Sequence, residues 1–143
     1  MTTYVKLLSD KAKLPTRGSE YAAGWDLYAA EETVILPGQC KKISTDIAIE
    51  LPNNTFGGIF ARSGLSTKRG LRPVNCVGVI DEDYRGPLVV ALYNDSDIPQ
   101  AVAAGERIAQ LIAIPYMNID IKEIDELTET LRGENGFGST GTN

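Results

Sequence analysis

The stretch ISTDIAIEL (residues 43–51) places Ile43, Ile47, Ile49 and Leu51 at alternate positions, with Thr45 completing the row. A repeat of two is that of a β-strand, so this stretch predicts a strand with one buried face. Turn-forming segments rich in Gly, Pro, Asn and Asp separate it from other short β-rich runs. These runs cover residues 4–8, 55–60, 74–80, 88–93 and 108–114. The pattern predicts an all-β fold, a jelly-roll-like barrel or sandwich of short antiparallel strands.

Outside these runs, the sequence predicts one short helix and a C-terminal tail. The helix is expected at residues 65–69. Residues 117–131 fit two patterns, because their first apolar residues keep strand spacing and their later ones keep helical spacing. Residues 132–143 are rich in glycine and have little to bury, which is typical of a mobile terminus. We therefore expect one domain at residues 1–131, followed by a flexible tail at 132–143.

The composition excludes several kinds of chemistry. The chain has 143 residues, with 14 Lys and Arg, 19 Asp and Glu, a net charge of −5 and no His. Without His, neither a Ser-His-Asp triad nor a His-ligated zinc site is possible, so acid–base chemistry falls to carboxylates, Lys or Tyr. The acidic balance argues against a nucleic-acid polymer as partner. Cys40 and Cys76 are too few for a zinc cluster or a disulfide scaffold, and are expected to be small buried hydrophobes.

The expected location follows from what the sequence does not contain. The N-terminus has no apolar stretch typical of a signal peptide, and no segment reaches the length of a membrane span. We expect a cytoplasmic protein with no membrane partner. For a eukaryotic or viral protein, the nucleus or an organelle stays open.

Three places in the body carry polar residues that chemistry could use. Asp81 directly follows an apolar run and could act as general base for a water, although an acidic loop such as 81–83 is usually just solvated. RSG (62–64) offers a cation, a hydroxyl and backbone N–H groups to an anion; its alternative is an ordinary helix N-cap. Asp26 and Gln110 stand among apolar residues, where a structural role is the alternative.

The tail carries a fourth candidate set. Taken alone, its glycines indicate only a disordered end, since the lysine of a phosphate-binding loop is missing. A disordered end, however, needs neither Arg132, nor the single aromatic Phe137, nor the hydroxyls of Ser139 and Thr140. Together these residues are typical of a flap that stacks on a ring and binds phosphate oxygens.

Five segments, in order, resemble the five signature motifs of the homotrimeric dUTP pyrophosphatases, the dUTPases. They are AGWDLYAA (23–30), RSGL (62–65), GVIDEDYRG (78–86), GERIAQL (105–111) and RGENGFGSTG (132–141). The resemblance implies Mg²⁺-dependent hydrolysis of dUTP to dUMP and pyrophosphate. Such an enzyme limits uracil incorporation into DNA and supplies dUMP for dTMP synthesis. It also implies a homotrimer with shared active sites, in which the tail closes over a neighbour's site.

The resemblance further implies a role for each matching residue. Asp81 would be the base that activates the water attacking the α-phosphorus, and Tyr84 would pack against the deoxyribose. Asp26 would support Mg²⁺ through water, with the metal held mainly by the triphosphate. The residues implied to read uracil or line its pocket are Asn75, Gly78, Val79, Ile80, Val89 and Phe137. Those implied to bind phosphate are Arg62, Ser63, Gly64, Gln110, Arg132, Gly138, Ser139 and Thr140.

Two other functions compete with this interpretation. One is a dCTP deaminase-type member of the same superfamily, which would release ammonia from a cytosine ring. The other is a non-catalytic nucleotide-binding regulator built on the same fold. The intact Asp81, Tyr84 and Phe137 favour the hydrolase, because a protein that only binds needs no base.

Overall fold

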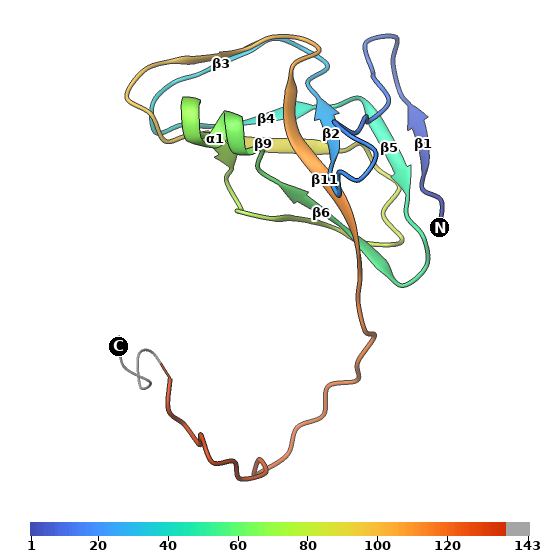
Figure 1. The fold of residues 1–143 in the computed structure, drawn as a ribbon, viewed down its shortest axis with the longest axis vertical. Coiled ribbons are helices and arrows are strands. Elements are labelled where there is room, and N and C mark those ends of the chain that lie inside the picture. The colour runs from blue at the N-terminus through green and yellow to red at the C-terminus, as the bar shows by residue number, and fades with distance from the viewer. Residues whose placement is uncertain (137–143) are drawn as a thin grey trace.

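The computed structural model describes residues 1–136, and within them the fold is all-β with one short helix (Figure 1). In chain order the elements are β1 (Tyr4–Leu7), β2 (Trp25–Tyr28), β3 (Thr33–Ile35), β4 (Cys40–Ser44), β5 (Ile47–Glu50), β6 (Thr55–Phe60), α1 (Ser63–Arg69), β7 (Leu71–Pro73), β8 (Gly78–Ile80), β9 (Val89–Asn94), β10 (Gln100–Val102) and β11 (Arg107–Pro115). The short antiparallel strands confirm the predicted jelly-roll class.

The strands form four small sheets that share one core. The largest has the order β2-β11-β6-β8, and the next has the order β4-β9-β7. β1 pairs with β5, and β10 pairs with β3. Apolar side chains from the four sheets meet in a single cluster that includes Leu27, Ile43, Leu92, Val102 and Ile108. Burial of this shared apolar surface is the main favourable contribution to the fold.

The stretch 43–51 forms two strands, where the alternation predicts one. The break lies at Thr45 and Asp46, and Asp46 has a φ of 51°. The burial period nevertheless survives, because Ile43, Thr45 and Ile47 are all buried. The chain therefore changes partner, from β9 along β4 to β1 along β5, without exposing its apolar row.

Two further predictions differ from the structure. Of the run 74–80 only Gly78–Ile80 is a strand, because a turn with a φ of 62° at Cys76 precedes it. Both cysteines are exposed, which corrects the expectation that they are buried. Cys40 begins a strand whose first three side chains face solvent, and Cys76 lies in that turn.

Helix α1 connects β6 to β7 and begins two residues earlier than predicted. Arg62 precedes it in an extended conformation, and Leu65 is its buried residue. Gly70 ends the helix with a φ of 65°, and its N–H bonds to the Ser66 carbonyl. This left-handed ending suits glycine and turns the chain directly into β7.

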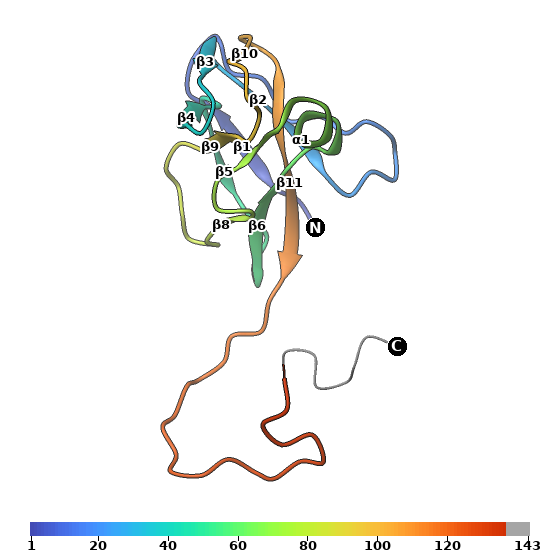
Figure 2. The same ribbon diagram turned by 90° about the vertical axis from the view of Figure 1, so that its left-hand side faces the viewer.

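Residues 116–136, which we call the arm, leave the body after β11 (Figures 1 and 2). They form neither of the two elements that fit residues 117–131 in the sequence. Their apolar side chains are exposed, among them Met117, Ile119, Ile121 and Leu127. No helix in residues 1–136 has the length and apolar character needed to cross a membrane.

Candidate functional site

Asp81 stands at the end of a strand that the sheet holds rigidly. β8 pairs with β6, so that Ile80 lies opposite Gly57 and Gly78 opposite Ile59. A Cβ at Gly57 would approach Leu111 to 3.0 Å and Ile80 to 3.2 Å, so glycine permits this close packing. The chain then turns, with the N–H of Tyr84 bonding to the Asp81 carbonyl at 3.1 Å. Asp81 is therefore exposed on a loop whose two ends are fixed.

The same loop positions Tyr84. The Tyr84 ring lies against Gly86, where a Cβ would approach the ring carbon Cζ to 2.6 Å. Its hydroxyl donates to the Pro87 carbonyl at 3.1 Å. Arg85 donates to the Glu82 carbonyl at 2.7 Å and closes the loop from the other side. Tyr84 is thus a fixed aromatic wall, with 43% of its surface still exposed.

The other described residues that were predicted to surround the nucleobase lie on β8, in the turn before it, or at the start of β9. Asn75 is exposed, and its Nδ2 would lie 3.4 Å from a Cβ at Gly78. Val79 and Ile80 continue along β8, and Val89 begins β9 on the other side of the loop. The structure therefore brings Asn75, Gly78 and Tyr84 close to Asp81 along β8 and the turns on either side of it, and we call these residues the β8 group.

A second group forms around Asp26. The Asp26 side chain is 13% exposed, and its carboxylate accepts from two guanidinium groups. Arg62 Nε lies 2.8 Å from Oδ1, and Arg107 Nη1 lies 3.2 Å from Oδ2. The register of β11 places Gln110 opposite both Asp26 and Phe60, and Gln110 Nε2 donates to the Ala61 carbonyl at 2.8 Å. Asp26 thus holds two arginines beside Gln110.

The start of α1 completes this second group, which we call the arginine group. The N–H groups of Leu65 and Ser66 bond to the Arg62 carbonyl and are the first to close the helix. The preceding N–H groups, of Ser63 and Gly64, point out of the helix start, as expected for the first amides of a helix. Ser63 and Gly64 are exposed, and a Cβ at Gly64 would meet nothing within 4 Å.

The two groups do not converge within one chain. Asp81 lies beside the start of β6, because Ile80 pairs with Gly57, whereas Arg62 follows the end of β6 at Phe60. The strand alone spans about 10 Å between Gly57 and Phe60, at roughly 3.3 Å per residue. A ligand that contacts both groups must therefore extend along β6, or take one of the two groups from another copy of the chain.

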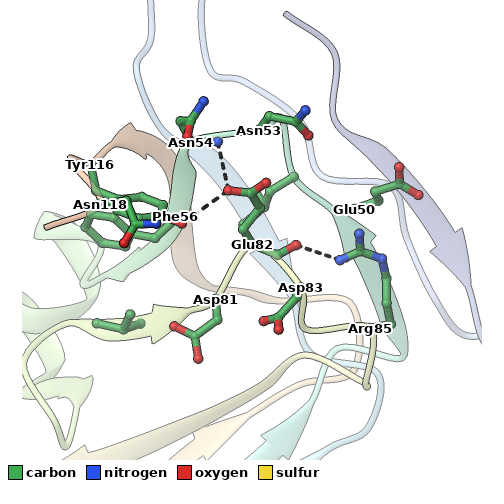
Figure 3. Close-up of a pocket in the computed structure, with 12 residues that line it drawn as sticks. Glu50, Asn53, Asn54, Phe56, Asp81, Glu82, Asp83, Arg85, Tyr116 and Asn118 are labelled. Atoms are coloured by element: carbon green, nitrogen blue, oxygen red, sulfur yellow. Dashed lines mark hydrogen bonds between the residues drawn. The ribbon is translucent and has the colours of Figure 1, made fainter. Parts of the chain in front are cut away.

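A hollow of about 770 Å³ lies on the Asp81 side of the sheet (Figure 3). Of the residues proposed from sequence, only Val79 and Asp81 line it. Its other lining residues are Glu50, Leu51, Asn53, Asn54, Phe56, Glu82, Asp83, Arg85, Tyr116 and Asn118. With four carboxylates against one guanidinium, this surface does not suit a polyphosphate by itself. The guanidinium groups of the arginine group supply the positive charge that this hollow does not.

Sequence reasoning missed Arg107. It belongs to the quoted segment 105–111, but nothing in its local pattern separates it from a surface arginine. Its contact with Asp26 joins residues 81 positions apart, which only the β2–β11 pairing brings together.

The tail residues are only partly described. Arg132 lies on the arm, where its Nε donates to the Asn135 carbonyl at 3.0 Å. Phe137, Gly138, Ser139 and Thr140 lie outside the described residues. In the described range, no three acidic or Cys side chains gather closely enough to hold a metal ion.

Comparison with known proteins gives a consistent result. The sequence profile of the dUTPase family matches residues 10–141. Deoxyuridine 5'-triphosphate nucleotidohydrolase of Candida albicans is 49% identical over 141 residues, which cover 97% of this chain and 87% of that protein. The dUTPase of Staphylococcus bacteriophage 80alpha, solved with dUpNHpp, superposes with a TM-score of 0.92 at 32% identity and covers 99% of both chains. A mutant dUTPase of Staphylococcus aureus phage phi11, described with a structural Mg(II) ion, is 27% identical with a TM-score of 0.82, over 90% of this chain and all of that one.

Proposed function

The chain belongs to the dUTPase family, and we propose that it hydrolyses dUTP to dUMP and pyrophosphate in the cytoplasm. The observation that carries the proposal is the β8 group. Strand β8 and the loop after it present an exposed carboxylate, Asp81, beside a fixed aromatic ring, Tyr84, and the backbone of Gly78–Ile80. This arrangement suits recognition of a nucleoside and activation of one water beside it.

The reaction needs one water, one base and neutralised charge. Asp81 accepts a proton from a water whose oxygen attacks the α-phosphorus in line. The bond from the α-phosphorus to the bridging oxygen breaks, and pyrophosphate leaves with the electron pair. No side-chain nucleophile is required, which agrees with a chain that has no His.

Selectivity for the nucleoside comes from the β8 group. The backbone of Gly78–Ile80 and the amide of Asn75 offer donors and acceptors to the uracil edge, which a cytosine edge would leave unpaired. The close approach of this backbone leaves no room for the methyl group of thymine. Tyr84, held in place by Gly86 and Pro87, would exclude the 2′-hydroxyl of a ribose.

Binding of the triphosphate falls to the arginine group. Asp26 engages Arg62 and Arg107 with both of its oxygens, and these charge-assisted hydrogen bonds favour contact with Mg²⁺ through water over direct coordination. The triphosphate itself would be the main ligand of the metal, which neutralises phosphate charge when bound. Arg62, Ser63, Gly64 and Gln110 would hold the remaining phosphate oxygens, together with Arg132 and Gly138–Thr140 of the tail.

We further propose that the working enzyme is a homotrimer with shared sites. The separation of the β8 group from the arginine group along β6 supports this, because another copy of the chain could bring its arginine group to this chain's Asp81. The arm supports it too, since its exposed Ile119, Ile121 and Ile124 need a surface to cover them. In this assembly Phe137 would stack on a neighbour's uracil.

The experiment is a pyrophosphate-release assay with Mg²⁺ and each of dUTP, dTTP, dCTP and UTP. We expect rapid hydrolysis of dUTP alone. Asp81→Asn should lower kcat by about 10²- to 10⁴-fold while retaining dUTP binding, because the amide cannot accept the proton. Asp97→Asn, on an exposed loop away from both groups, is the matched control.

Three outcomes would contradict the proposal. Full activity of Asp81→Asn would show that Asp81 is not the base. Release of ammonia from dCTP without hydrolysis of dUTP would identify a deaminase. Calorimetric binding of dUTP without turnover would identify a nucleotide-binding regulator.

A further inference from the structure

Three distant segments meet at one carboxylate oxygen beside the Asp81 loop. Glu82 Oε2 accepts from the backbone N–H of Asn54 at 2.7 Å and from the hydroxyl of Tyr116 at 3.2 Å. The N–H of Tyr116 donates to the Asn54 carbonyl at 3.1 Å, which closes a ring of three hydrogen bonds. Figure 3 shows Glu82 pointing toward Asn54, while Asp81 and Asp83 point away.

Each member of this ring has a defined place in the fold. Asn54 is the turn residue before β6, with a φ of 58°. Glu82 directly follows Asp81. Tyr116 directly follows Pro115, the last residue of β11, and is therefore the root of the arm. The ring thus joins the loop of the proposed base to the point where the arm leaves the body.

We propose that Glu82 and Tyr116 are positioning residues that lock the Asp81 loop to the root of the arm. The inference rests on the proposed function, in which Asp81 is the base and the arm carries the closing tail. With the lock intact, the Asp81 loop is held against the start of β6 and the root of the arm, so Asp81 keeps its position beside the attacking water. Neither residue needs to contact the nucleotide for this role.

The chemistry of the two hydrogen bonds to Glu82 supports this role. A hydrogen bond to a charged acceptor contributes more than a neutral one, and here a single charged oxygen accepts two. Partial desolvation, followed by the hydrogen bond to Glu82 and the charges of Glu82, Asp83 and Asp81, raises the pKa of the Tyr116 hydroxyl. The hydroxyl therefore stays a donor throughout the neutral range. Arg85, bonded to the Glu82 carbonyl, fixes the backbone of the same residue.

The test uses the full-length chain with Glu82→Ala, Tyr116→Phe and both together, assayed with dUTP and Mg²⁺. We expect kcat to fall about tenfold in Glu82→Ala and about threefold in Tyr116→Phe, with KM within about threefold of wild type. The double variant should resemble Glu82→Ala, because both changes break the same ring. Glu82→Gln keeps an oxygen acceptor at this position and should restore most of kcat.

Hydrogen exchange supplies a readout that does not depend on activity. The Asn54 amide should exchange faster in Glu82→Ala than in wild type, and Glu82→Gln should slow it again. Tyr21→Phe and Glu31→Ala, on exposed loops elsewhere, are the matched controls.

The outcomes separate this inference from the proposed function. A wild type that does not hydrolyse dUTP would contradict the proposed function. The hydrogen-exchange measurement would still test the lock in that case. Folded variants with wild-type kcat and unchanged exchange would overturn the lock. Lower melting temperatures with unchanged kcat per folded enzyme, or additive losses in the double variant, would also overturn it.

Discussion

Asp46 occupies the turn between β4 and β5 with a φ of 51°, a left-handed conformation that Asp and Asn tolerate better than most residues. Its carboxylate accepts from the hydroxyls of Ser44 and Ser9, the latter at 2.7 Å. These bonds, Ser44 first and then Ser9, lower the pKa of Asp46, and the charge of Lys11 lowers it further. The residue that divides the predicted strand 43–51 is therefore stabilised in its charged form.

The lowered pKa of Asp46 predicts a pH dependence of stability. A carboxylate with a lower pKa in the folded state stabilises the fold above its unfolded pKa, near 3.8, and loses this contribution as pH falls through the folded pKa. At pH 7 Asp46→Asn should therefore melt below wild type. The difference should shrink as pH falls below about 4, as melting curves across pH 2–8 would measure. A difference that is constant across this range would show that the charge of Asp46 contributes nothing.

At the scale of elements, the β2–β11 pairing builds the arginine group. It places Asp26 opposite Gln110, and Gly24, just before β2, lies against the Gln110 side chain. A Cβ at Gly24 would overlap Gln110 Oε1 and lie 3.0 Å from its Cδ. Glycine at position 24 thus lets Gln110 keep its hydrogen bond to Ala61.

Gly24→Ala should therefore move one side chain without unfolding the sheet. The clash is with the end of a flexible side chain, so we expect a small change in melting temperature and a several-fold rise in KM for dUTP, on the order of the loss of one hydrogen bond. Gly18→Ala is the control, because a Cβ there meets nothing within 4 Å. An unchanged KM in a folded Gly24→Ala would remove Gln110 from the phosphate-binding set.

At the scale of the whole molecule, the arm and the tail have separable roles. The arm exposes a row of isoleucines and leucines that the body does not cover, and the tail carries the last sequence motif. In the proposed trimer, the arm contributes to assembly and the tail to closure of the site.

Two variants test this division. A chain ending at Leu131 should keep the trimer but lose most turnover, because its sites would stay open to water. Ile119→Asp/Ile121→Asp should give a monomer that also loses turnover. Light scattering coupled to size exclusion measures the mass, and pyrophosphate release measures the activity. A monomeric wild type, or a trimeric Ile119→Asp/Ile121→Asp, would contradict the shared-site proposal.

Local patterns in the sequence determined the fold class and most elements of the sheets. Alternation and turn residues suffice to find strands such as Thr55–Phe60, which the structure confirms with the same bounds. The sequence did not predict the short strands β2, β3, β7 and β10, because a segment of three or four residues shows no clear hydrophobic period. The candidate site residues came from the five segments that resemble the dUTPase motifs, and their individual roles stay predictions.

Only the tertiary structure decided how these residues combine. It divided the predicted site between two ends of β6, added Arg107 to Asp26, and joined Glu82 to Asn54 and Tyr116. It also left residues 117–131 without the strand or helix that their spacing allows. The physical reason is the same in each case: hydrogen bonds, ion pairs and apolar burial join groups that are distant in the sequence. The periodicity of a segment shows which of its residues share a face, but not which distant segment of the chain packs against that face.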